Sequence, residues 1–286
     1  METTIRKNPI DWWKLSSVCL VHAITLLGII LWLKKVPVIQ FTWRSVVFTD
    51  VWFVLSCTSV TAGYHRLFSH PTYRATTLLK IFLLLLAAAA FQGSAYQWSA
   101  LHRDHHKFVD KNGDPYRIWR GWRGFLHAHI GWVVRKTYPN FNRVKDLARN
   151  PLILWQHRLD VPLGVTMTFV LPAMIGMLWG EALGSLFLAG FVRLVIQWHM
   201  TFSVNSIAHC WGERKYSDKG TARGTGFLIA LLTWGEGQSH ERHHAVQIDY
   251  RTGIRWWDFD PAKWAIWTWS KVGLASNLRR VRFTND

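Results

Sequence analysis

The sequence LLKIFLLLLAAAAF occupies residues Leu78–Phe91, with Lys80 as its single charged residue. A long apolar run of this kind is typical of a helix in a bilayer or in a large core. Each of four further apolar runs has close to the roughly 20 residues that a membrane span requires. These runs lie at about residues 15–33, 46–64, 162–179 and 184–202. Five such helices would need a larger core than a soluble chain of 286 residues offers, so the sequence predicts an all-α integral membrane protein.

The composition agrees with a membrane protein. Half of the residues are hydrophobic, 19 are tryptophan, and 34 lysines and arginines outnumber 17 acidic residues, which gives a formal net charge of +17. Basic segments between apolar runs are typical of membrane proteins, and no nucleic-acid partner is predicted. No Ser- or Pro-rich linker divides the chain, so we expect a single domain over residues 1–286.

Nine of the fourteen histidines fall into four short groups, which is typical of a metal site. Imidazole is the commonest metal ligand in proteins. One ion rarely takes more than six ligands, so nine candidates predict a pair of ions. The nine are His65, His70, His102, His105, His106, His209, His240, His243 and His244.

The spacing within the groups indicates how the imidazoles are presented. Two copies of the pattern H-x-x-H-H, beginning at His102 and at His240, place three imidazoles each on one face of a helix. His65 and His70 are five residues apart and diverge around an α-helix. This divergence predicts that the two bind different ions from one helix end.

The histidine groups also constrain the path of the chain, because the ligands of one ion pair must lie on one side of the membrane. If residues 78–97 crossed, the group at His102 would emerge roughly 30 Å from His65. This segment is therefore expected to lie along the interface, and its second half is amphipathic. The other four runs then form two transmembrane hairpins, with interfacial amphipathic helices and a histidine-rich cap on the face that carries both termini.

The charge distribution orients this arrangement. The turn at Glu181 has no Lys or Arg, whereas residues 103–160 and 211–286 are rich in both. By the positive-inside tendency, the cap and both termini are predicted to be cytoplasmic.

A metal transporter or sensor is a remote alternative function, because such a protein would place its metal ligands within the spans rather than at their ends.

The ligand set favours iron over zinc. Zinc prefers four ligands, and its hydrolytic sites usually combine histidines with a carboxylate or an open water position. Nine histidines at a membrane surface better fit two iron ions, with dioxygen as oxidant and a lipid as substrate. Asp104 and Glu241 lie inside the two H-x-x-H-H copies and are candidate acceptors that orient imidazoles through their far N–H groups. A solvated surface carboxylate is the alternative for each.

Several stretches of the chain can be compared with known families. They are GYHRLFSH at Gly63–His70, AFQGSAYQW at Ala90–Trp98, HRDHHKF at His102–Phe108, NSIAH at Asn205–His209, GEG at Gly235–Gly237, HERHHA at His240–Ala245, RWWDF at Arg255–Phe259 and GLASNL at Gly273–Leu278. Over nearly the whole chain they resemble the membrane fatty acid desaturases of the acyl-CoA Δ9 type, which are stearoyl-CoA desaturase-like. The last two resemble the tails of bacterial and plastid-type members.

The resemblance implies a di-iron oxidoreductase of unsaturated fatty acid biosynthesis. Such an enzyme uses O2 and two electrons to introduce a cis double bond into a saturated acyl chain carried on CoA, here at a bacterial inner membrane. The nine histidines would be the iron ligands, and Asn205 would hold an iron through a water molecule. The residues that match substrate-binding positions of the family are Trp98, Thr201, Phe202, Gln92 and Arg135.

Some features depart from the family or leave an alternative open. The family usually has H-N-x-H-H after an aromatic residue, whereas Gln238-Ser239 stand before His240 and Glu241-Arg242 replace the Asn position. No haem-binding H-P-G-G stretch occurs, so electrons are expected from a separate ferredoxin, rubredoxin or cytochrome. A hydroxylase acting on a fatty acid, alkane or carotenoid shares this scaffold and is the alternative. Arg193 is a cation inside the last apolar run, and the sequence assigns it no role.

Overall fold

The computed structural model describes residues 8–119, 121–216 and 220–282. Within them, four helical segments are long and apolar enough to cross a membrane, which confirms the predicted fold class. These segments are Trp12–Leu33, Trp43–Ser69, Asp160–Met177 and Ala182–Cys210. The second and fourth run past their predicted ends at residues 64 and 202, and so carry the chain directly to its histidines.

Three of the four spans change their helical geometry along their length. The first span is the single α-helix α1 (Trp12–Leu33), which does not change. The second span is α2 (Trp43–Thr58) followed by the π-helix η1 (Ser59–Ser69). The third comprises α7 (Asp160–Val165), the π-helix η5 (Thr166–Val170) and α8 (Leu171–Met177). The fourth comprises α9 (Ala182–Ser185), the π-helix η6 (Leu186–Val192) and α10 (Arg193–Cys210).

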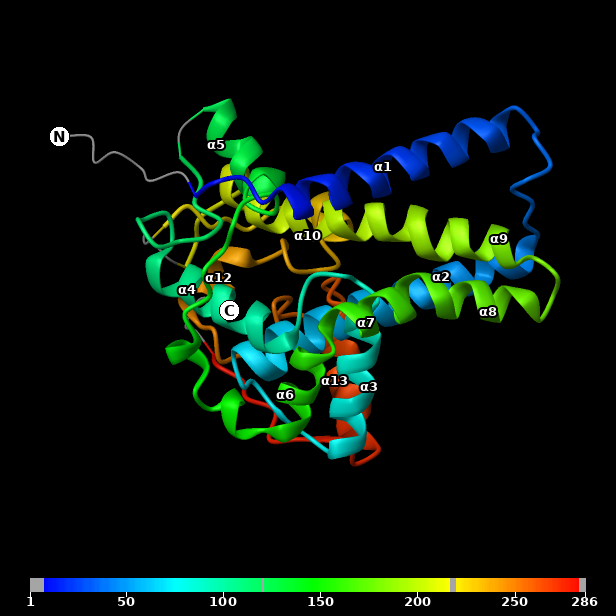
Figure 1. The fold of residues 1–286 in the computed structure, drawn as a ribbon. Coiled ribbons are helices and arrows are strands. Elements are labelled where there is room, and N and C mark those ends of the chain that lie inside the picture. Colours follow the sequence, from blue (N-terminus) through cyan, green and yellow to red (C-terminus); the bar gives the residue numbers. More distant parts are fainter. Residues whose placement is uncertain (1–7, 120, 217–219, 283–286) are drawn as a thin grey trace.

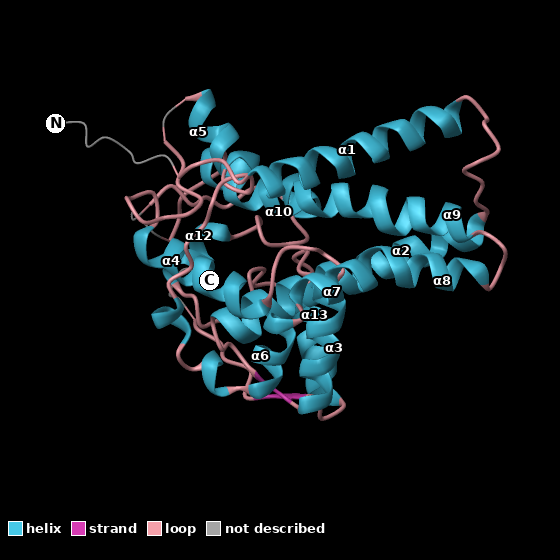
Figure 2. Cartoon of the chain, viewed as in Figure 1, coloured by secondary structure: helices cyan, strands magenta, loops and turns pink. Residues whose placement is uncertain are grey.

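Shorter elements build the rest of the molecule, and Figure 2 shows that most of them are helices joined by loops. The remaining helices are α3 (Thr77–Ala88), α4 (Ala95–Phe108), α5 (Trp122–Leu126), η2 (His127–Gly131), η3 (Phe141–Val144), η4 (Leu147–Arg149), α6 (Pro151–Arg158), α11 (Phe227–Leu232), α12 (His240–Ala245) and α13 (Pro261–Lys271). Two short strands, β1 (Arg74–Ala75) and β2 (Ala275–Ser276), pair antiparallel and tie the C-terminal segment to the chain before α3.

The four spans run side by side, with the fourth between the first two (Figure 1). Both α1 and α2 pack on η6, so the first two spans are consecutive but separated. Gly28 permits the close approach of α1, because a Cβ atom there would overlap the ring of Phe187 in η6. At the end away from α4 and α12, the Glu181 carboxylate accepts hydrogen bonds from Thr42 N (2.9 Å) and Ser45 Oγ (2.6 Å), which joins the two turns.

The apolar run Leu78–Phe91 is too short a helix to cross a membrane. Helix α3 has 12 residues and is about 18 Å long, well short of the roughly 30 Å of a bilayer core. The chain then turns at Phe91, whose φ is 49°, and α4 begins after the N-cap Ser94. In Figure 1, α3 stands across the direction of the spans. The segment predicted as one interfacial stretch is therefore a short helix, a turn and the start of α4.

The role of Arg193 follows from this turn. The carbonyl groups after α3 have no helical partner, and unsatisfied carbonyls in an apolar medium are unfavourable. Arg193 Nη1 and Thr168 Oγ1 donate to the Ala89 carbonyl at 2.8 and 3.1 Å, and Trp198 Nε1 donates to the Ala90 carbonyl at 2.9 Å. The third and fourth spans thus cap the broken end of α3.

Replacing Arg193 with methionine is expected to destabilise the protein. The change removes the hydrogen bonds that Arg193 donates to the Ala89 and Ala189 carbonyls and to the Gln197 side chain. Thr168 and Ser56 still donate to Ala89 and Gln197, so the cost is that of the lost hydrogen bonds, about 0.5–1.5 kcal/mol each. The thermal unfolding midpoint in detergent should fall, whereas Arg44→Met, at an exposed position, should leave it unchanged. Equal midpoints for the two variants would show that the cap is unimportant.

The largest buried cluster lies around η1, where it packs against α3, α4 and α13. Tyr64 and Leu83 are fully buried, and Tyr64 OH accepts a hydrogen bond from Gln156 Nε2 at 2.8 Å. Gly63 lets α3 approach, because a Cβ atom there would lie 3.2 Å from Leu83 Cβ. This core fixes the backbone that carries His65 and His70.

Candidate metal centre

The structure brings all nine predicted histidines into two neighbouring clusters. Within each cluster, one ring nitrogen from every member lies within 4.8 Å of the others. The five-histidine cluster comprises His65, His70, His102, His106 and His243. The four-histidine cluster comprises His105, His209, His240 and His244.

The π-helix η1 places His65 and His70 in the same cluster. Their ring centroids are 5.0 Å apart, and His70 N donates to the His65 carbonyl at 3.2 Å, an i to i+5 hydrogen bond. In a π-helix, residues five apart share a face. The expectation that these two histidines serve different ions is therefore wrong, because it assumed α-helical geometry.

Helices α4 and α12 each divide their three histidines between the clusters. The i,i+4 pair of α4, His102 and His106, has Nε2 atoms 3.0 Å apart in the five-histidine cluster. The i,i+4 pair of α12, His240 and His244, has Nε2 atoms 3.2 Å apart in the four-histidine cluster. The middle histidine of each helix joins the other cluster. Both short helices thus contribute to both groups.

The imidazole separations fit ligands around an ion. Ligands about 2.1 Å from a metal and at right angles to one another are about 3 Å apart. Nε2 atoms in the five-histidine cluster are 2.9 Å apart for His65 and His243 and 2.8 Å apart for His70 and His102. Because each neutral ring carries only one N–H, an Nε2 atom with two imidazole neighbours cannot donate to both, whereas a shared cation would bind all of the lone pairs.

Nδ1 of three histidines lies close to an oxygen outside the clusters, in a hydrogen bond for His105 and His209 and at ion-pair distance for His65. Glu236 Oε2 lies 3.1 Å from His65 Nδ1, and Asp114 Oδ1 lies 2.9 Å from His105 Nδ1. Thr221 Oγ1 lies 2.9 Å from His209 Nδ1. An acceptor at Nδ1 fixes the N–H there and leaves the Nε2 lone pair directed into the cluster.

Asp104 and Glu241, which were predicted to orient imidazoles, lie next to cations. Asp104 Oδ1 accepts from Arg143 Nε at 2.9 Å, and Lys215 acts electrostatically on the buried Glu241. Their predicted role stays a prediction. The sequence signal for the observed acceptors is weak, because Glu236 is 171 residues from His65.

Burial disfavours the charged form of six of the cluster histidines. Burial first, and then the neighbouring imidazoles, hold the pKa of six of them well below the usual value near 6.5. The six are His70, His102, His106, His240, His243 and His244. Neutral imidazoles are the form that binds metal ions.

The metal-free protein is therefore expected to lose stability on acidification. The unfolded chain protonates these histidines near pH 6.5, whereas the folded chain does not, so the contribution is present above that pH and is lost below it. Each group contributes up to about 1.4 kcal/mol per pH unit to this loss. Thermal unfolding of chelator-treated protein should show midpoints that fall from about pH 7 to about pH 5. Midpoints independent of pH would contradict the neutral, buried state.

A largely apolar cavity of about 350 Å3 reaches both clusters. His65 and His102 of one cluster and His105 and His240 of the other line it, as does Asn205. Four of the five residues predicted to bind substrate also line the cavity: Trp98, Thr201, Phe202 and Gln92.

Two groups of residues outside the clusters also line the cavity. One group is Trp13 and Lys14, at the start of α1. Arg135, the fifth predicted substrate residue, is outside the lining but beside this group, because its carbonyl lies 3.4 Å from Lys14 Nζ. The other group is Cys57 and Gln197, within the second and fourth spans.

Fold and site together define an integral membrane protein with two buried histidine clusters beside an apolar cavity. Residues 41–274 match the fatty acid desaturase family, and the chain belongs to that family.

Three relatives illustrate the similarity. A probable acyl-CoA desaturase of Schizosaccharomyces pombe is 41% identical over 239 residues, which cover 82% of this chain and 49% of the relative. Acyl-CoA desaturase 1 of Saccharomyces cerevisiae is 36% identical, with 82% and 46% covered. The stearoyl-CoA desaturase of Sus scrofa is 34% identical over 278 residues, with 94% and 74% covered. The chain thus spans about half the length of the two yeast relatives.

Proposed function

We propose that the protein is a di-iron fatty acyl desaturase. In this proposal it uses O2 and two electrons to convert a saturated acyl chain, carried on CoA, into a cis-Δ9 monoene. The observation that carries it is the apolar cavity, because it joins both histidine clusters to the residues that match the family's acyl-binding positions. Family membership and the names of the relatives support the reaction and the acyl-CoA substrate.

The nine clustered histidines would hold the two iron ions, and Asn205 would hold one through a water molecule. The chemistry that bound iron supplies is oxidation of an unactivated C–H bond by dioxygen. Asn205 lies four residues before His209 in α10 and so shares a helix face with it. Asn205 also lines the cavity, as is expected of a residue that lies between the metal ligands and the substrate.

The cavity residues position the acyl chain. Trp98 stacks on His102 with ring centroids 4.7 Å apart, so its indole lines the cavity beside the five-histidine cluster. Gln92 Nε2 donates to Thr201 Oγ1 at 2.9 Å, which fixes two lining side chains. Saturated carbons offer no polar handle, so the shape of this enclosure must select the methylene pair. Its apolar walls also exclude water from the reacting carbons.

The CoA headgroup would bind near the start of α1. Lys14 supplies a cation at this part of the cavity, and Arg135 lies beside it. Cationic side chains suit a phosphate-bearing headgroup. This end of the molecule would face the cytoplasm, at the inner membrane of a bacterial cell, where a separate ferredoxin, rubredoxin or cytochrome would supply the electrons.

Expression in a host that cannot make monoenes, followed by mass analysis of its lipids, tests this function. We expect new cis monoenes, and we expect none from the His105→Ala variant. Hydroxylated products would instead favour a hydroxylase on the same scaffold. A folded protein that yields neither product in a host supplied with each donor type would contradict the proposal.

A further inference from the structure

The two histidine clusters are supported from behind by different carboxylates. Glu236 stands behind His65 of the five-histidine cluster, and Asp114 stands behind His105 of the four-histidine cluster. Both carboxylates are buried, with exposed side-chain fractions of 6% for Glu236 and 0% for Asp114. Because neither carboxylate contacts solvent, its protein hydrogen-bond partners determine which oxygen atom it presents to the histidine.

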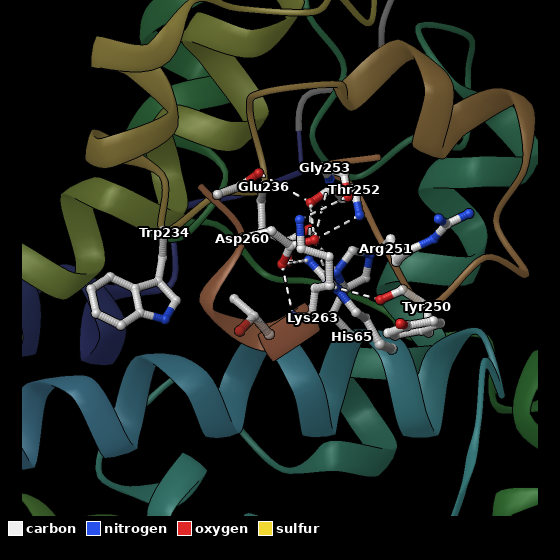
Figure 3. A network of polar contacts seen from close by, with 12 residues as sticks. His65, Trp234, Glu236, Tyr250, Arg251, Thr252, Gly253, Asp260 and Lys263 are labelled. Atoms are coloured by element: carbon white, nitrogen blue, oxygen red, sulfur yellow. Dashed lines mark hydrogen bonds and ion pairs between the residues drawn. The ribbon is translucent and has the colours of Figure 1, made fainter. Parts of the chain in front are cut away.

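Glu236 is held by a network that reaches the C-terminal segment (Figure 3). Its Oε1 accepts from Arg66 Nη2 at 2.7 Å, and the same guanidinium lies 2.9 Å from Asp260 Oδ1. Asp260 also accepts from Thr252 N at 2.9 Å and caps α13 by accepting from Lys263 N at 3.0 Å. Since Arg66 occupies Oε1, Glu236 presents only Oε2 to His65.

Asp114 is held by backbone groups instead. Its Oδ1 accepts from Tyr116 N at 2.9 Å as well as lying 2.9 Å from His105 Nδ1. Its Oδ2 accepts from Asp110 N at 2.8 Å. Asp110 in turn lies 3.1 Å from Thr221 Oγ1, the group that contacts His209 of the same cluster. The loop after α4 therefore serves the four-histidine cluster.

From this separation we propose that Glu236 and Asp114 are positioning residues, each dedicated to one metal ion of the pair. Glu236, backed by Arg66 and Asp260, supports the ion in the five-histidine cluster. Asp114 supports the ion in the four-histidine cluster. The inference rests on the proposed function only in taking the nine histidines as ligands of two ions.

The effect of an amide at either position follows from the hydrogen bonds. In Glu236→Gln, the amide oxygen must face Arg66, which only donates, so the NH2 group faces His65 Nδ1. The His65 proton then moves to Nε2, where the ion requires a lone pair. In Asp114→Asn, both oxygens already accept backbone N–H groups, so the amide loses one of these bonds or presents NH2 to His105. Loss of such orienting contacts typically weakens metal binding by 10–100-fold.

Titration of the metal-free, detergent-purified protein with Co2+, followed by absorption spectroscopy, tests the proposal. The unmodified protein should bind two ions. Each variant should weaken one of the two binding constants by about 10–100-fold and leave the other unchanged. Glu213→Gln is the matched control, because this glutamate is exposed and pairs with Lys215. The unchanged second constant shows that the variant is folded.

A background in which His70, His102 and His243 are all replaced by alanine identifies which ion is affected. These changes leave only two histidines of the five-histidine cluster, so the background should bind one ion. Adding Glu236→Gln should then have no further effect, whereas adding Asp114→Asn should weaken the remaining ion by about 10–100-fold. The proposal is overturned if either carboxylate change alters both constants or neither, or if Glu236→Gln weakens the remaining ion. If Glu236→Gln does not fold, the Asp114→Asn arm applies the same criteria alone. An unmodified protein that binds fewer than two ions would contradict the proposed function instead.

Discussion

Replacing His243 with alanine is expected to abolish formation of the unsaturated product and to weaken binding of the ion in the five-histidine cluster. His243 Nε2 lies 2.9 Å from His65 Nε2 and 3.1 Å from His106 Nε2, so it is central to the five-histidine cluster. Its side chain is buried, and solvent cannot readily supply a replacement ligand. Product formation should be lost together with the bound metal, because the oxidation requires both ions.

Lipid analysis of cells that express the variant measures the product, and elemental analysis of the purified variant measures the metal. His22→Ala is a matched control, since His22 is partly buried and its Nε2 lies 3.1 Å from His199 Nε2, but it belongs to neither cluster. The control should retain activity and both ions. Product formation by His243→Ala at the level of the His22→Ala control would refute the assignment of this histidine.

A bulkier side chain at position 57 is expected to shift the products toward shorter acyl chains. Cys57 lines the cavity eight residues before His65 in the second span, about two helical turns further into the membrane. An acyl chain that enters near Lys14 and passes the clusters would end in this region. Leucine at position 57 would occupy space that the last methylenes need.

One methylene in an apolar pocket changes selectivity by about 10–200-fold. The ratio of long to short products from Cys57→Leu should therefore fall by at least about tenfold. Cys57→Ala, which enlarges the cavity at the same position, should leave the ratio of long to short products unchanged or raise it. Gas chromatography of the fatty acid esters measures both ratios. An unchanged ratio in Cys57→Leu, with activity retained, would place the end of the chain elsewhere.

The sequence predicted the membrane topology because the chemistry of one site restricts it. The convergence of His102 with His65 required that residues 78–97 do not cross, and α3 proves too short to do so. The packing order of the spans was less accessible, because the close contact of Gly28 with Phe187 depends on residues far apart in the chain.

The sequence also predicted which histidines come together, but not how they divide. The division depends on the π-helical geometry of η1, which the α-helical periodicity used for sequence patterns does not represent. Glu236 and Asp114 were missed because orienting contacts are made across the fold rather than at a fixed spacing. Glu236 did lie in a recognised stretch, Gly235–Gly237, and that proximity to a motif was the one available signal.

The most direct test of the account is the iron content of the protein purified under conditions that retain tightly bound metal. Two histidine clusters predict about two iron ions per chain, in two inequivalent environments by Mössbauer spectroscopy. About one ion per chain, or a single environment with four ligands and no second ion, would contradict the paired centre.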